Sequence, residues 1–116
     1  MRTETDILNL IRLALSEKGI INFRNNVGAL KDINGRLVKY GLCTGSSDII
    51  AIRPVVITPE MVGSAIGQFV AIEVKQQGEK PNDAQERFLE IIRKHGGLAG
   101  VARSVEELDH LLRSKE

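Results

Sequence analysis

The stretch Ile72-Glu73-Val74-Lys75 decides which fold and which chemistry we expect of this chain. In an extended strand successive side chains point to opposite faces, so Glu73 and Lys75 share one face. Ile72 and Val74 share the other face, which we expect to project into apolar packing. The stretch therefore predicts a strand that sets an acid beside an amine.

A second acid, Asp48, lies upstream in the sequence Gly45-Ser46-Ser47-Asp48-Ile49-Ile50. Hard cations such as Mg²⁺ prefer carboxylate oxygens, lower the pKa of an attacking water and neutralise a transferring phosphoryl group. Asp48 and Glu73 can supply such ligands, while Lys75 can orient the water and offset charge in the transition state. The pattern favours a metal-dependent phosphodiesterase site, although Glu-x-Lys is also typical of a solvated strand face.

Length and charge narrow the class of protein. The chain has 116 residues, 42% of them hydrophobic, which fits one compact domain over 1–116 with a modest core. Its formal charge of +1 excludes a global field that draws it to DNA or to an anionic membrane, so DNA contact requires a local patch.

The single cysteine, Cys43, excludes an internal disulfide and a cysteine zinc cluster, and suits a reducing compartment. With no run near the roughly twenty apolar residues that cross a bilayer, we expect a soluble, cytoplasmic protein.

Capping residues and apolar periodicity predict three helices. Thr3 with Asp6, and Asn82 with Gln85, each match a capping box at a helix start. Ser104 opens the last helix in the same way. We expect these helices to cover 4–18, 82–95 and the residues from 104 onward.

A turn signal and aliphatic runs predict the strands between the helices. Asn34-Gly35 favours a hairpin between Ile33 and Leu37, because both central residues of such a turn take positive φ. The remaining predicted strands cover 20–24, 48–52, 69–75 and 98–102. The expected class is α/β with the order α-(β)-β-β-β-α-β-α, where the bracketed strand is 20–24.

Two further polar residues have two interpretations each. In one interpretation Glu4 falls on the helix face that should be buried, where a carboxylate needs a hydrogen-bond or charge partner. In the other, Glu4 is a half-exposed first-turn glutamate favoured by the helix dipole. Gln85 shares a helical face with Phe88 and Leu89 and can reach toward Lys75. Its plainer role is to complete the capping box at Asn82, and the geometry favours that role.

Several segments together carry a resemblance to a known family. They are Glu4, Phe23-Arg24-Asn25-Asn26-Val27-Gly28, Gly45-Ser46-Ser47-Asp48-Ile49, Ile72-Glu73-Val74-Lys75, Gln85 and Gly96-Gly97-Leu98-Ala99-Gly100-Val101-Ala102-Arg103. Over nearly the whole chain this combination resembles the viral replication and repair nuclease family, VRR-NUC, of the PD-(D/E)XK superfamily. The resemblance implies a restriction-endonuclease-like core with a mixed central β-sheet flanked by helices, and an endonuclease that depends on Mg²⁺ or Mn²⁺.

The resemblance also implies roles for individual residues. Asp48 and Glu73 would be the metal carboxylates, the backbone carbonyl of Val74 would complete the metal shell, and Lys75 would be the catalytic lysine. Glu4 and Gln85 would support the site. Ser47 stands where the superfamily name promises a proline, but that proline supplies no ligand.

The expected partner is DNA. By analogy, stand-alone members of this size resemble phage-encoded proteins, and relatives act as homodimers on four-way junctions or flaps in replication and repair. Loop and hairpin residues nominated for phosphate contact are Arg24, Asn25, Asn26, Lys31, Arg36, Lys39 and Lys80, with Arg103 after the last strand. Phosphate contacts position DNA without reading sequence, and these aromatic-poor loops offer little stacking, so shape selectivity is expected. Taken individually, each of these side chains is better explained as a solvated surface group, and Arg24 and Asn26 gain most from the resemblance.

Two rival functions come from other classes. In one, the acids are idle and a dimeric module of the same fold binds DNA without cutting it. In the other, the segment 55–61 engages a protein partner. Cleavage of DNA separates the enzyme from both rivals.

Overall fold

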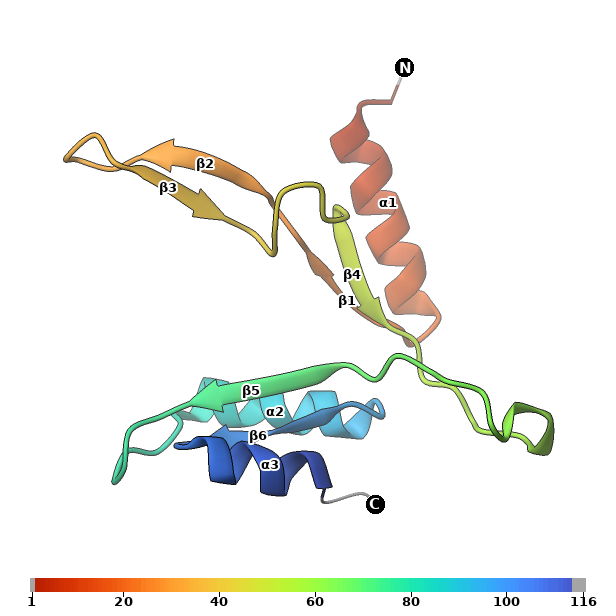
Figure 1. The fold of residues 1–116 in the computed structure, drawn as a ribbon. Helices are drawn as coiled ribbons and strands as arrows, with labels where there is room; N and C mark the ends of the chain where they lie inside the picture. Colours follow the sequence, from red (N-terminus) through yellow and green to blue (C-terminus); the bar gives the residue numbers. More distant parts are fainter. Residues whose placement is uncertain (1, 114–116) are drawn as a thin grey trace. The chain divides into compact units, whose positions relative to one another are not determined.

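The chain is a mixed α/β protein, and residues 2–113 of the computed structural model are described here (Figure 1). In chain order its elements are α1 (Glu4–Glu17), β1 (Ile21–Arg24), β2 (Gly28–Lys31), β3 (Leu37–Tyr40), β4 (Ile49–Ile52), the 3-10 turn η1 (Pro59–Met61), β5 (Val70–Val74), α2 (Asp83–Lys94), β6 (Leu98–Ala102) and α3 (Val105–Arg113). They group into two compact units, Met1–Arg53 and Pro54–Glu116. The expectation of a single domain stays a prediction.

Helix α1 begins and ends where local signals place its boundaries. Thr3 Oγ1 accepts from the Asp6 backbone N–H at 3.1 Å, and Asp6 Oδ2 accepts from the Thr3 N–H at 3.1 Å. Gly19, at a φ of 75°, turns the chain so that the Ile20 N–H reaches the Leu15 carbonyl at 2.9 Å. The predicted capping box is confirmed, and the helix ends at Glu17, one residue earlier than predicted.

Asn22 joins α1 to β1. Its side chain is 9% exposed, and its Oδ1 accepts from Arg12 Nε at 2.9 Å. Its Nδ2 donates to Ser16 Oγ and to the Ile20 carbonyl, each at 3.1 Å. This buried amide is therefore satisfied on both of its polar atoms by groups of the helix and the strand.

Strands β1 and β4 pair in antiparallel fashion, from Ile21 opposite Ile52 to Arg24 opposite Ile49. The next backbone group continues the pairing, because the Asn25 N–H donates to the Asp48 carbonyl at 2.8 Å. The backbone of Asp48 is thus held in line with β1.

Strands β2 and β3 form the predicted hairpin, but its turn differs from the predicted one. Gly35 has a φ of 77°, while no non-glycine residue in 2–113 has positive φ, so Asn34 lacks the conformation we expected. Asp32 organises the turn instead: its Oδ1 accepts from the backbone N–H groups of Asn34 and Arg36, and its carbonyl accepts from Gly35. Ile33 lies in this turn and is 99% exposed, not in a strand.

The second unit is built on a parallel pair, β5 and β6, connected by α2. Its core consists of Leu89, Ile92, Leu98, Ala99 and Ala102, all buried. Glycine permits α3 to pack closely on β6, because a Cβ on Gly100 would lie 2.7 Å from Leu111 Cδ1. Parallel strands need a crossover connection, and α2 supplies it.

Side chains along β5 alternate between exposed and half-buried, as in a strand with two different faces. The exposed face is the aliphatic one, which was predicted to be buried. Glu73 and Lys75 are half-buried, whereas Ile72 is exposed and Val74 is 75% exposed. The predicted apolar packing of Ile72 and Val74 was therefore wrong for the described structure. Among residues 2–113, strand β5 pairs only with β6, and α2 and α3 contact mainly β6, so the aliphatic face of β5 has little cover within its unit.

The three strand pairs, β1 with β4, β2 with β3 and β5 with β6, are separate two-stranded sheets in the described part of the chain. The mixed α/β class is confirmed. The single central sheet stays a prediction, and five strands lie between α1 and α2, one more than the predicted order contains. Among the described residues, no helix is long and apolar enough to cross a membrane.

We expect Asn22→Ala to lower the free energy of unfolding by about 1 to 3 kcal/mol, because Arg12 and Ser16 lose a buried partner. Urea denaturation followed by circular dichroism measures this loss. The matched control is Asn9→Ala on the exposed surface of α1, which should stay within about 0.5 kcal/mol of wild type. Equal urea midpoints for the two variants would contradict the role given to Asn22.

Candidate functional site

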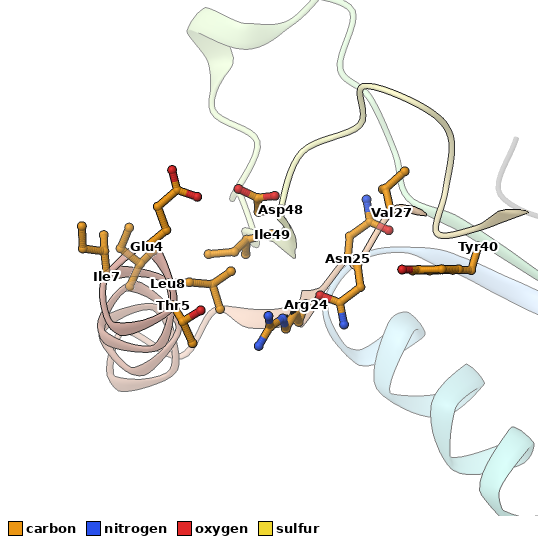
Figure 2. Close-up of a pocket in the computed structure, with 12 residues that line it drawn as sticks. Glu4, Thr5, Ile7, Leu8, Arg24, Asn25, Val27, Tyr40, Asp48 and Ile49 are labelled. Atoms are coloured by element: carbon orange, nitrogen blue, oxygen red, sulfur yellow. Dashed lines mark hydrogen bonds between the residues drawn. The ribbon is translucent and has the colours of Figure 1, made fainter. Parts of the chain in front are cut away.

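A cavity of about 610 Å³ lies in the first unit, beside the first turns of α1 and the segment after β1. Figure 2 shows the carboxylates of Glu4 and Asp48 on the same side of this cavity, with Arg24 below them in the view. The lining residues are Glu4, Thr5, Ile7, Leu8, Ile11, Arg24, Asn25, Asn26, Val27, Tyr40, Asp48 and Ile49. Five of the residues nominated from the sequence are therefore brought together here.

The two acids reach the cavity from different elements. Glu4 is in the first turn of α1 and is exposed, which agrees with the first-turn interpretation rather than with a buried carboxylate. Asp48 precedes β4 and is also exposed. Their carboxylates offer only oxygen donors, and this donor chemistry fits Mg²⁺ or Mn²⁺. No group of three or more His, Cys, Asp or Glu side chains that could hold a metal occurs within residues 2–113.

Asn25 holds the loop that leads to Asp48. Its Nδ2 donates to Ser46 Oγ at 2.7 Å and to the Ser47 carbonyl at 2.9 Å, and its Oδ1 accepts from the Leu42 N–H at 3.1 Å. Ser46 in turn donates to the Cys43 carbonyl at 2.7 Å. Both polar atoms of the Asn25 side chain are therefore bonded within the protein, and neither is left for the predicted contact with a phosphate.

Arg24 and Asn26 form a pair on the surface of the cavity. Arg24 Nε donates to Asn26 Oδ1 at 2.7 Å, which orients the guanidinium group. Its two terminal nitrogens donate to no protein group within the part of the chain described. A guanidinium fixed at Nε and open at its ends has donors available for a phosphate.

In the second unit, Glu73 of β5 and Lys75, the residue just after β5, lie side by side as predicted. Lys75 Nζ is 3.9 Å from a Glu73 carboxylate oxygen, and the side chains are 20% and 29% exposed, respectively. The Lys75 N–H donates to the Ala102 carbonyl at 3.3 Å, which extends the pairing of β5 with β6 past Val74. An ammonium and a carboxylate are thus both withdrawn from bulk water on one strand face.

Gln85 performs its plainer role. Its Oε1 accepts from the Asn82 N–H at 2.9 Å, while Asn82 Oδ1 accepts from the Gln85 N–H at 2.8 Å. The capping box is therefore confirmed. A contribution of Gln85 to chemistry near Lys75 stays a prediction.

Arg103 fastens the segment after Lys75 to the end of β6. Its Nη2 donates to the Glu79 carbonyl at 2.6 Å, and its Nη1 lies 3.9 Å from the Glu107 carboxylate. The Arg103 N–H also donates to Glu107 Oε1 at 3.0 Å. These bonds give Arg103 a structural role in the described chain, whereas its phosphate contact stays a prediction. Lys80 lies in the exposed segment that Arg103 fastens.

The β2–β3 hairpin presents two different faces. Leu30 opposes Val38 and Gly28 opposes Tyr40 on one face, as the register requires. Lys31 and Lys39 lie on the other face, and Arg36 lies in the turn; all three cations are exposed. The register thus supports a local basic patch despite the near-neutral chain.

Tyr40 is the one aromatic residue among the cavity residues that were not nominated from the sequence. It is the only tyrosine in the chain, and it lines the cavity beside Val27 and Asn25 (Figure 2). The sequence did not reveal its partner, because counting outward from the predicted two-residue turn sets Tyr40 opposite Ala29, whereas the wider turn of the structure sets it opposite Gly28. The grouping of Asp48 with Glu73, Val74 and Lys75 in one metal site stays a prediction.

The described chain is thus mixed α/β, with two exposed acids lining a cavity in the first unit and an acid–lysine pair in the second. The family model for the VRR-NUC domain matches residues 2–106, so the chain belongs to the VRR-NUC family. Membership makes it a nuclease-like DNA-processing domain with DNA as its class of partner. No curated protein and no solved structure matched the chain.

We expect Asn25→Ala to lower the free energy of unfolding by about 1 to 3 kcal/mol, because the loop before Asp48 loses its fixing bonds. Asn26→Ala, one residue further on and exposed, should change it by no more than about 0.5 kcal/mol. Urea denaturation of both variants tests this. An Asn25→Ala protein that unfolds like wild type yet loses affinity for DNA would restore the phosphate-contact interpretation.

Proposed function

We propose that the chain is a metal-dependent endonuclease that hydrolyses DNA phosphodiester bonds. The observation that carries the proposal is the half-buried Glu73–Lys75 pair at the end of β5, with 3.9 Å between the charged atoms, in a chain of the VRR-NUC family. A carboxylate that can bind a cation and an ammonium that can offset phosphoryl charge are the two groups that this hydrolysis needs.

The proposed cofactor is Mg²⁺ or Mn²⁺, held by the carboxylates of Asp48 and Glu73 and by the carbonyl of Val74. All three donors are oxygens, as these cations prefer. When bound, the cation supplies charge neutralisation at the phosphoryl group and a water of lowered pKa.

Lys75 is the proposed catalytic lysine. Its ammonium group would orient the attacking water and stabilise negative charge that develops on the phosphoryl oxygens. The neighbouring Glu73 carboxylate, with one oxygen 3.9 Å from Lys75 Nζ, attracts the ammonium group and favours this position of it. Glu4 would support the metal shell from α1. Gln85 has its amide oxygen engaged by Asn82, so only its NH₂ group remains to donate toward the site.

The proposed substrate is branched DNA, such as a junction or a flap, cut by a homodimer during phage or cellular replication and repair in the cytoplasm. Exposed cations support a phosphate-contacting surface: Arg24 in the cavity, and Lys31, Arg36 and Lys39 on the hairpin. Such contacts position DNA by shape and carry no sequence information.

A second candidate function is a non-catalytic module that binds DNA or a protein partner. The observation in its favour is the segment around η1, where Val55, Val56, Ile57 and Val62 all expose aliphatic side chains. Binding of a partner that is unaffected by Asp48→Ala, with no cleavage of any DNA, would favour this alternative.

We expect wild type to cut labelled four-way-junction or flap DNA with Mg²⁺ or Mn²⁺ and to cut nothing in EDTA. Lys75→Ala should lower the rate about 100- to 1,000-fold, since it removes a charge aimed at the transition state. Single-stranded and duplex DNA in the same assay reveal the preferred substrate.

The matched control for this assay is Lys94→Ala, which removes an exposed lysine of α2 in the same unit. Its cleavage rate should equal that of wild type. Binding of every DNA without cutting, by wild type at any metal concentration, would overturn the nuclease and favour the non-catalytic module.

We also expect Mn²⁺ or Mg²⁺ to raise the melting temperature of wild type. Two carboxylates about 4 Å apart repel by roughly 4 kcal/mol at an effective dielectric of about 20, so a site that unites Asp48 and Glu73 is strained without metal. Metal at about 100 times its Kd should add about 2.7 kcal/mol to the free energy of unfolding. Thermal melts with and without metal measure this; an equal rise in Asp48→Asn would argue against the site.

A further inference from the structure

Tyr40 is placed in the cavity by its partner across the hairpin. Gly28 lies opposite Tyr40 in the β2–β3 register, and a glycine leaves room there for a ring. A Cβ built on Gly28 would stand 2.6 Å from Tyr40 Cζ and 3.2 Å from Cε1. Any side chain at position 28 would therefore displace the ring, so the glycine and the tyrosine form one packed pair.

Those distances also show which part of the ring is covered. The atom nearest to the added Cβ is the Tyr40 hydroxyl oxygen, followed by Cζ at 2.6 Å and Cε1 at 3.2 Å, so Gly28 packs against the hydroxyl end of the side chain. Tyr40 nevertheless remains 43% exposed. The side chain thus touches backbone at its hydroxyl end and keeps accessible aromatic surface, and such a surface can stack on a base.

The rest of the cavity supplies complementary groups. Figure 2 shows the Tyr40 hydroxyl directed toward Asn25, with Asp48 and Arg24 lining the same cavity. Arg24 is held at Nε by Asn26 and has its terminal nitrogens available for a phosphate. Aromatic surface, a cation and two carboxylates line the same cavity of about 610 Å³.

We propose that Tyr40 forms a subsite that stacks an unpaired nucleobase of the DNA strand whose phosphate contacts Arg24. The inference rests on the proposed function, because it assigns a contact to the same DNA. Aromatic rings bind any base by its π face, so the subsite selects unpaired nucleotides without selecting sequence. A base that is stacked within a duplex has no free face to offer, so such a subsite would favour DNA with unpaired positions beside a branch.

The chain offers a direct readout of this contact. It contains one tyrosine and no tryptophan, so its intrinsic tyrosine emission reports on Tyr40 alone. Wild-type protein in EDTA, where no strand is cut, is titrated with a short oligothymidylate. The matched probe is an oligomer of the same length with abasic sugars, which carries the phosphates but no bases.

We expect saturable quenching of Tyr40 emission by oligothymidylate, after correction for absorbed exciting light, and little change with the abasic oligomer. A fully paired duplex should also quench little. Equal quenching by the abasic oligomer, or no response to oligothymidylate at all, would overturn the subsite. Because this measurement uses wild type, it does not depend on the folding of any variant.

Variants test the energetic weight of the ring. Tyr40→Ala should weaken binding of labelled oligothymidylate by roughly 5- to 100-fold, the loss expected for one stacked base. Tyr40→Phe keeps the ring and should bind within about twofold of wild type. Binding of the abasic oligomer should be unchanged in both variants; an equal loss for both oligomers in Tyr40→Ala would indicate a structural role and overturn the proposal.

Failure of the subsite and failure of the nuclease give different results. Cleavage of junction DNA without base-dependent quenching keeps the nuclease and removes the subsite. Base-dependent quenching by a protein that cuts nothing keeps the subsite and removes the nuclease.

Discussion

Asn25 is the residue on which the geometry of the first unit's cavity depends. Its backbone N–H bonds to the Asp48 carbonyl, and its side chain bonds to Ser46, Ser47 and Leu42. The regular pairing of β1 with β4 stops at Arg24, and beyond it the Asn25 side chain holds the irregular loop before Asp48 in place. The position of the Asp48 carboxylate and the width of the cavity both follow from this loop, so an acid at the protein surface gains a defined location without being buried.

Features that depend on neighbouring residues in the chain were predictable from the sequence. Both capping boxes formed as predicted, because each involves side chains and backbone groups three residues apart. The acid–amine pair on β5 also followed from strand alternation alone. The hairpin was predicted, but its turn was not, since Asp32 can accept two backbone N–H groups and thereby competes with the expected conformation at Asn34.

Features that depend on distant residues were not predictable in the same way. The exposure of Ile72 and Val74 depends on which elements cover β5, and strand alternation does not carry this information. Asn25 and Arg103 were assigned to DNA by residue type, whereas partners 17 to 24 residues away engage them within the protein. Residue type identifies groups able to bind phosphate, but only the fold shows which of them are already bonded.

The β2–β3 hairpin has a consequence for the way the first unit assembles. Strands β1 and β4 are far apart along the chain, and bringing them together costs entropy that grows with the length of the intervening loop. The hairpin lies within that loop and is closed by contacts between neighbours in sequence, so it can form first and carry Asn25 toward Asp48. A formed hairpin roughly halves the flexible length, which lowers the cost of pairing β1 with β4 by about 0.6 kcal/mol. The β2–β3 hairpin therefore reduces the loss of chain entropy when β1 pairs with β4.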